Sequence, residues 1–204
     1  MSGSLNHPIP SIFDRTNEIE VEALDDFDPE AESDHLKFKG VPVDGTLELF
    51  VGRMKNFGFS QLEYHDGTAI MEGDFADYKG CMLVVNTLRS KDLVNKVTVA
   101  FPDREKWGQL EGDYSHIKSL LTEKYGKPES CTEKFQFKSY EDRDDKHKIY
   151  ALEDDRCTYT SHFYTDKGDI VLSITHGKWH CYVSLLYEDK LNSGVIQEHA
   201  LGDL

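Results

Sequence analysis

The fold follows from the stretch TLELFVGRMKNFG at residues 46–58 and from a second stretch of the same design, EKWGQLEGDYSHIKSLLTEKYG at residues 105–126. Each ends on a glycine, Gly58 or Gly126, and strand-like sequence follows. Glycine tolerates the left-handed backbone conformation that closes many helices. The two stretches therefore predict helices over Thr46–Phe57 and over about Glu105–Tyr125.

One face of each predicted helix is apolar. Thr46 is the expected N-cap of the first helix and Asp103 that of the second. The spacing i, i+3, i+4, i+7 gives the first helix an apolar face made of Leu47, Phe50, Val51 and Met54. The corresponding stripe of the second helix consists of Trp107, Leu110, Tyr114, Ile117 and Leu121. Both helices are therefore expected to pack on a sheet.

Four strand-like segments follow each helix. Those after the first are Phe59–Tyr64, Thr68–Phe75, Cys81–Leu88 and Leu93–Phe101, and those after the second are Cys131–Phe137, Arg156–Tyr164, Asp169–His176 and Trp179–Tyr187. The stretch Tyr140–Lys148, dense in Asp and Lys, predicts an exposed loop. This order is typical of an α+β protein with two helix-then-antiparallel-meander units, about 35–102 and 103–190, which form a mainly antiparallel sheet packed by two helices.

The N-terminal residues 1–34 form an acidic leader. They carry ten acidic residues and one basic residue, a net charge of −9, whereas the whole chain carries −15. Within the leader, acidic and apolar residues alternate over residues 18–23, which predicts either a strand that adds to a sheet edge or a disordered tail. The candidate partner-binding residues are Glu18, Glu20, Glu22, Asp25, Asp26 and Asp28. Residues 191–204 are expected to form a short C-terminal helix or strap.

Composition excludes several classes of function. The acidic charge of the chain disfavours direct binding to nucleic acid phosphates. The sequence contains no run of about 18 apolar residues, so it predicts no transmembrane helix. The N-terminus lacks the pattern of a secretory signal, so we expect a cytoplasmic protein, or an exported one if residues before Met1 have been removed. The four cysteines, Cys81, Cys131, Cys157 and Cys181, are expected to be buried reduced thiols, although two disulfides in an oxidising compartment stay open.

No motif for catalysis or cofactor binding is present, and we expect no cofactor. The nearest approach to a metal site is His176 and His180 with His162, Cys157 and Cys181. Strand alternation points His180 away from Cys181, which argues against convergent zinc ligands. We therefore expect no metal site.

Three segments carry a resemblance to known proteins. They are HLKFKGVPVDGTL at residues 35–47, GDFADYKGC at 73–81 and LTEKYGKP at 121–128, with His35–Gly45 and Tyr125–Pro128 as the most characteristic parts. The chain resembles, over about residues 35–190, a group of uncharacterised proteins from gut bacteria. Several of these look exported, and the group implies no activity or site residue. A helix ending in Tyr-Gly-x-Pro before a meander is also similar to the repeating units of β-lactamase-inhibitor-like and outer-membrane-assembly lipoprotein folds.

Three hypotheses about function follow. The first is a non-catalytic protein-binding module, of an inhibitor or immunity type, that uses a sheet face or edge together with the acidic leader to hold a basic protein partner. The alternative is a small-ligand-binding protein or an enzyme with a site near His162, His176 and His180. The third is a structural subunit of a larger assembly.

Overall fold

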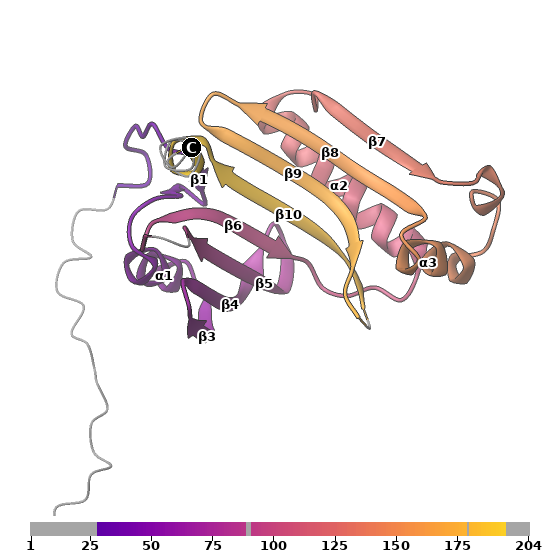
Figure 1. Cartoon of the computed structure of the whole chain (residues 1–204), viewed down its shortest axis with the longest axis horizontal. Coiled ribbons are helices and arrows are strands. Elements are labelled where there is room, and N and C mark those ends of the chain that lie inside the picture. The colour runs from indigo at the N-terminus through magenta and orange to yellow at the C-terminus, as the bar shows by residue number, and fades with distance from the viewer. Residues whose placement is uncertain (1–27, 89–90, 179, 195–204) are drawn as a thin grey trace, which may run out of the picture.

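The computed structural model describes residues 28–88, 91–178 and 180–194 (Figure 1). Its helices are α1 (Leu47–Asn56), α2 (Trp107–Tyr125) and α3 (Asp145–Glu153), with a short 3-10 turn η1 (Lys138–Tyr140). The strands are β1 (Lys37–Phe38), β2 (Val41–Pro42), β3 (Ser60–His65), β4 (Thr68–Phe75), β5 (Tyr78–Thr87), β6 (Val94–Ala100), β7 (Ser130–Phe135), β8 (Cys157–Thr165), β9 (Gly168–His176) and β10 (Cys181–Asp189).

Strands β3 to β10 form one antiparallel sheet in the order β3-β4-β5-β6-β10-β9-β8-β7. The first meander runs inward from one edge to β6 and the second runs inward from the other edge to β10. The two units join where β6 pairs with β10, with Leu185 opposite Val99 and Tyr187 opposite Val97. The predicted α+β class, with a mainly antiparallel sheet packed by two helices, is confirmed.

The glycine signals mark true helix ends. Gly58 and Gly126 both have φ of +86°, and the Oγ1 of Thr46 accepts a hydrogen bond from Leu49 N at 3.3 Å, as expected of an N-cap. All nine residues of the two predicted apolar faces are buried. The prediction that Asp103 caps α2 is wrong, because Arg104 N bonds Cys181 O at 2.9 Å and holds the chain beside β10 until Trp107.

The stretch Tyr140–Lys148 is not wholly a loop, because α3 begins within it at Asp145. The carboxylate of Asp144 accepts a hydrogen bond from His147 N at 3.0 Å and caps the helix. The apolar residues that anchor α3, Ala151 and Leu152, are buried and come after the charged stretch. The charged sequence of residues 140–148 therefore did not predict the helix, because the buried residues of α3 lie near its C-terminal end.

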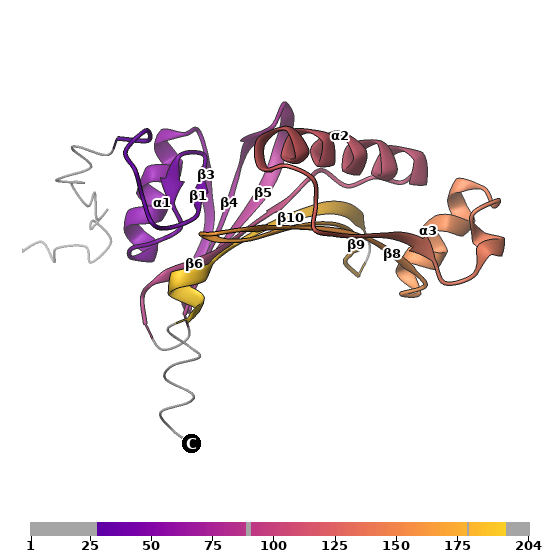
Figure 2. The ribbon, with the colours of Figure 1, turned by 90° about the horizontal axis from the view of Figure 1, so that it is seen from above.

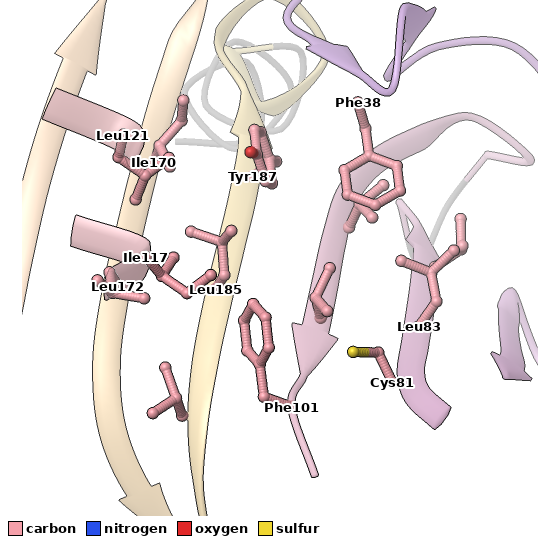
Figure 3. Close-up of a cluster of buried hydrophobic side chains, with 14 of the residues drawn as sticks. Phe38, Cys81, Leu83, Phe101, Ile117, Leu121, Ile170, Leu172, Leu185 and Tyr187 are labelled. Atoms are coloured by element: carbon pink, nitrogen blue, oxygen red, sulfur yellow. The ribbon is translucent and has the colours of Figure 1, made fainter. Parts of the chain in front are cut away.

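Helices α1 and α2 pack on the same face of the sheet. Residues paired in register point to one face, and the pairing chain from Met71 through Leu83, Val99 and Leu185 to Leu172 is buried throughout. Figure 2 shows α2 along β8–β10 and α1 beside β3 and β4, in a strongly twisted sheet. Figure 3 shows side chains from α2, β9, β10 and β5 meeting in this core, with Phe38 of β1 at one end.

A buried carboxylate ties the start of the body to the end of the sheet. Asp189 is 0% exposed and accepts hydrogen bonds from Leu36 N at 2.7 Å, His35 Nδ1 at 3.0 Å and Asn192 N at 2.9 Å. Asn192 lies in the helical turn 190–194, the described part of the predicted strap, and donates to Val94 O at 2.9 Å. Three donors satisfy the charge that burial would otherwise destabilise.

Near this contact, Gly168 is a position where any side chain would strongly destabilise the fold. A Cβ there would lie 2.2 Å from the carbonyl oxygen of Glu188 in the neighbouring strand. Gly168→Ala should therefore lower the free energy of unfolding by about 2 kcal/mol or more. Urea denaturation followed by circular dichroism measures the change.

Gly112 provides the matched control on α2. A Cβ there would meet nothing within 4 Å, so Gly112→Ala should raise stability by about 0.5–1 kcal/mol through helix propensity. Equal effects of the two substitutions would contradict the packing described at Gly168.

Candidate functional site

The face of the sheet opposite α1 and α2 is open in the described part of the chain. Its residues form rows across the strands because paired residues share a face. One row runs from β4 to β8 as Ile70, Val84, Thr98, Leu186, Val171 and His162. The next row runs in the same strand order as Glu72, Met82, Ala100, Ser184, Ser173 and Thr160.

The middle of this face lacks formal charge. The ten residues of the two rows that lie on β5, β6, β10, β9 and β8 are all half-buried, and we call them the central patch: Val84, Thr98, Leu186, Val171, His162, Met82, Ala100, Ser184, Ser173 and Thr160. With 30% charged residues in the chain, about three charges would be expected among ten surface positions, whereas depletion of charge is typical of interface centres.

A charged row borders the central patch on one side. It contains Lys96 of β6, Glu188 of β10 and Asp169 of β9, which are neighbours in register. Lys96 Nζ lies 3.7 Å from Glu188 Oε1. One base against two acids leaves this border acidic.

The predicted acidic site is described only at its last residue. Glu18, Glu20, Glu22, Asp25 and Asp26 lie outside the described residues. Asp28 is exposed, and its Oδ1 accepts a hydrogen bond from Glu30 N at 2.9 Å, which shapes a turn.

The described end of the leader meets the body near the end of β10, on the face of the sheet that the helices cover. Lys37 Nζ donates to Pro29 O at 2.8 Å, so the last part of the leader packs on β1. Leu36, just before β1, bonds Asp189 at the end of β10, and Asp189 directly follows Glu188. Because consecutive residues of a strand point to opposite faces, this contact lies near the end of the acidic row but on the other face of the sheet.

The three predicted histidines do not converge. His162 pairs with Val171, and His176 lies five residues further along β9, about 16 Å at the usual rise of a strand, and on the other face. The Nε2 of His176 lies 3.3 Å from Asp155 Oδ1. His180 is exposed beside the β9–β10 hairpin, with its ring 5.6 Å from that of Tyr182. The three histidines line no common groove among those described below. A ligand-binding or enzymatic function near them therefore stays a prediction.

None of these histidines lines either of two grooves that the described residues form. One, of about 580 Å³, lies at the tip of the β3–β4 hairpin near Tyr64 and Asp92. The other, of about 570 Å³, lies between α2 and β7. Within the described residues, no three His, Cys, Asp or Glu side chains are grouped to hold a metal ion.

A polar cluster beside the second groove escaped the sequence reasoning. Lys118 Nζ lies 3.2 Å from Cys131 Sγ and 2.5 Å from Glu133 Oε1, and Ser161 Oγ donates to Cys131 Sγ at 3.5 Å. The hydroxyls of Ser161 and Tyr114 are 2.6 Å apart. The prediction that all four cysteines are buried is wrong for Cys131, which is exposed on the edge strand β7, and for Cys157, which is half-buried. All four thiols are free.

Electrostatics within the cluster follow from burial and the Lys118–Glu133 ion pair. Partial burial favours the neutral form of Glu133, but hydrogen bonds from Lys118 and Cys131 outweigh it and hold the Glu133 pKa below its ordinary value. Burial likewise lowers the pKa of Lys118, but the hydrogen bonds to Glu133 and Cys131 together with the charge of Glu133 outweigh burial, and the net pKa is raised. Burial raises the pKa of the Tyr114 phenol well above its usual range. Lys118 and Glu133 are therefore both charged at neutral pH.

Comparisons with known proteins give no relatives. No family model matches the chain, and neither a search of curated proteins nor one of solved structures gives a match. The resemblances inferred from the sequence stay predictions. In residues 28–88, 91–178 and 180–194, no helix is both long and apolar enough to cross a membrane.

The buried hydroxyl pair predicts a specific pattern of stability changes. Ser161→Ala removes a partner of the buried Tyr114 phenol and should cost about 1–3 kcal/mol. The double variant with Tyr114→Phe should cost less than the sum of the single changes, because no hydroxyl is then left without its partner. Urea denaturation of the four proteins measures the coupling. Tyr150→Phe, at a tyrosine 52% exposed, is the control and should change stability by less than about 0.5 kcal/mol. If the loss of stability in the double variant equals the sum of the losses in the two single variants, the hydrogen bond between Ser161 and Tyr114 would be contradicted.

Proposed function

We propose that the protein is a non-catalytic protein-binding module whose contact surface is the open face of the sheet. The observation that carries the proposal is the central patch, a half-exposed and uncharged surface in a highly charged chain. A protein interface usually has few charged residues at its centre and a polar, solvent-accessible rim.

The size of the central patch favours a partner that also contacts its border. From β4 to β8 the face spans six strands, about 24 Å at the usual strand spacing. A standard interface buries about 800 Å² on each partner, which is more than two rows of side chains provide. The remaining contacts would come from the acidic border and from the leader.

The charge distribution sets the chemistry of the partner. Asp169 and Glu188 place negative charge at one end of the face, and the leader adds a net charge of −9 to the chain. This favours a protein with an apolar patch bordered by basic residues. An inhibitor or immunity-type protein that covers a basic surface of its target fits this description.

Substitution within the central patch tests the contact surface. Val84→Asp together with Leu186→Asp adds two charges to half-exposed positions, so the fold should persist while the partner is lost. Affinity capture from the source cell's lysate, read by mass spectrometry, identifies partners, and calorimetry with the purified partner measures the loss.

Leu120→Asp supplies the matched control. Leu120 is 41% exposed on α2, on the covered side of the sheet, and its substitution should leave binding unchanged. Equal capture by the native and central-patch variants, or equal loss in the Leu120 variant, would refute the proposed surface. Circular dichroism verifies that each variant is folded.

Neutralising the leader tests its part in binding. Glu18→Gln, Glu20→Gln and Glu22→Gln combined should raise the off-rate of the partner and flatten the salt dependence of binding, because rim charges act through screened electrostatics. Surface plasmon resonance at several salt concentrations measures both quantities.

The control neutralises the same number of charges elsewhere, at the exposed residues Glu123, Glu129 and Glu141. Its kinetics should match those of the native chain. Identical behaviour of the two triple variants would remove the leader from the proposed interface.

A further inference from the structure

One of the four thiols differs from the others in its accessibility. Cys81 and Cys181 are buried, and burial raises the pKa of each to about 11. Cys157 is half-buried, and burial raises its pKa to about 12. These three thiols are protonated at neutral pH, and Cys81 and Cys181 are also shielded from reagents. Cys131 is exposed on the edge strand β7.

The Cys131 thiol lies among groups that can assist its chemistry. Its S–H donates to Glu133 Oε1 at 3.3 Å, so a carboxylate is placed to receive the proton. Lys118 Nζ and Ser161 Oγ donate to the sulfur at 3.2 and 3.5 Å. Partly exposed cysteines with a nearby cationic donor are the ones that react.

A groove of about 570 Å³ adjoins the thiol. It is lined by Ser115, Lys118, Ser119, Thr122, Glu123 and Glu133. Lys118 and Glu133 belong both to the groove and to the contacts of Cys131, so the groove adjoins the sulfur. Its volume is within the range of small-molecule sites.

The groove lining indicates the class of ligand. One ammonium, two carboxylates and three hydroxyls complement a small zwitterion that carries its own carboxylates and amine. A peptide thiol of the glutathione type has these groups and a sulfur that can meet Cys131.

We propose that Cys131 is a site of reversible modification that forms a mixed disulfide with a small zwitterionic peptide thiol held in the groove between α2 and β7. The co-reactant is the symmetrical disulfide of that thiol. Cys131 gives its proton to Glu133 and its sulfur attacks one sulfur of the disulfide. The bond between the two reagent sulfurs breaks as the new bond forms, and the departing thiolate takes up the proton. Excess reduced thiol reverses the exchange.

This inference is independent of the proposed protein-binding function. Cys131 pairs with Ser161, on the face that α2 covers, whereas the central patch lies on the other face. Failure of one proposal would therefore leave the other standing.

The test uses the native full chain with oxidised glutathione at neutral pH, and peptide mass spectrometry locates the adduct. Cys131 should be modified first, and the other three thiols only after denaturation. Cys131→Ser should abolish the native-state adduct. Modification of Cys157 at the same rate as Cys131 would overturn the assignment.

A second arm separates ligand binding from simple exposure of the thiol. Lys118→Met should slow the reaction with oxidised glutathione by about tenfold, because the ammonium attracts its carboxylates. The same variant should slow the reaction with the neutral reagent 4,4′-dithiodipyridine much less, because only the contact of Lys118 with the sulfur is then lost.

Lys124→Met is the matched control, since this exposed lysine of the same helix does not line the groove. Its rates should be native with both reagents. Equal rates for the Lys118 and Lys124 variants with oxidised glutathione, or equal slowing of the Lys118 variant with both reagents, would overturn the proposed ligand site. Thermal melting verifies that each variant is folded.

Discussion

The antiparallel pairing of β6 with β10 is the interaction on which the rest of the structure depends. It joins the inner strands of two meanders, so the outer strands β3 and β7 become the edges of one sheet. Because the paired strands keep their buried residues in register, Val97 beside Tyr187 and Val99 beside Leu185, the apolar faces of both units coincide. Helices α1 and α2 then cover the same face, and the opposite face of the described sheet is left open.

This arrangement separates two kinds of surface chemistry. The open face carries the uncharged central patch with an acidic border at Glu188 and Asp169. The contacts of Asp189, which fasten the start of the body to β10, lie on the covered face. The covered face ends at the edge strand β7, where Lys118 of α2 reaches Cys131 and Glu133. The two surfaces lie on opposite sides of the sheet, so a ligand at one does not compete directly with a ligand at the other.

Much of the local structure follows from the chain itself. Thr46, Gly58 and Gly126 act within one helical turn, and the alternation along β9 and β10 correctly separates the buried Cys181 from the exposed His180. The errors arise where a residue's role depends on distant partners. Cys131 has strand-like neighbours, as Cys181 does, but it lies in an edge strand and is exposed, whereas β10 is central. Asp103 would suit a helix cap, yet a bond to β10 delays the helix.

The sequence by itself determined the helices, most of the strands and which side of each faces the core, because helix caps, turn glycines and periodicity act over a few residues. Only the tertiary structure decided the order of the strands, the edge position of β7 and the assembly of Lys118, Cys131, Glu133 and Ser161 into one cluster. It also decided that the uncharged positions of five strands align as the central patch. These features depend on pairing between segments far apart in the chain, and that pairing is selected by how the whole core packs, not by any local pattern.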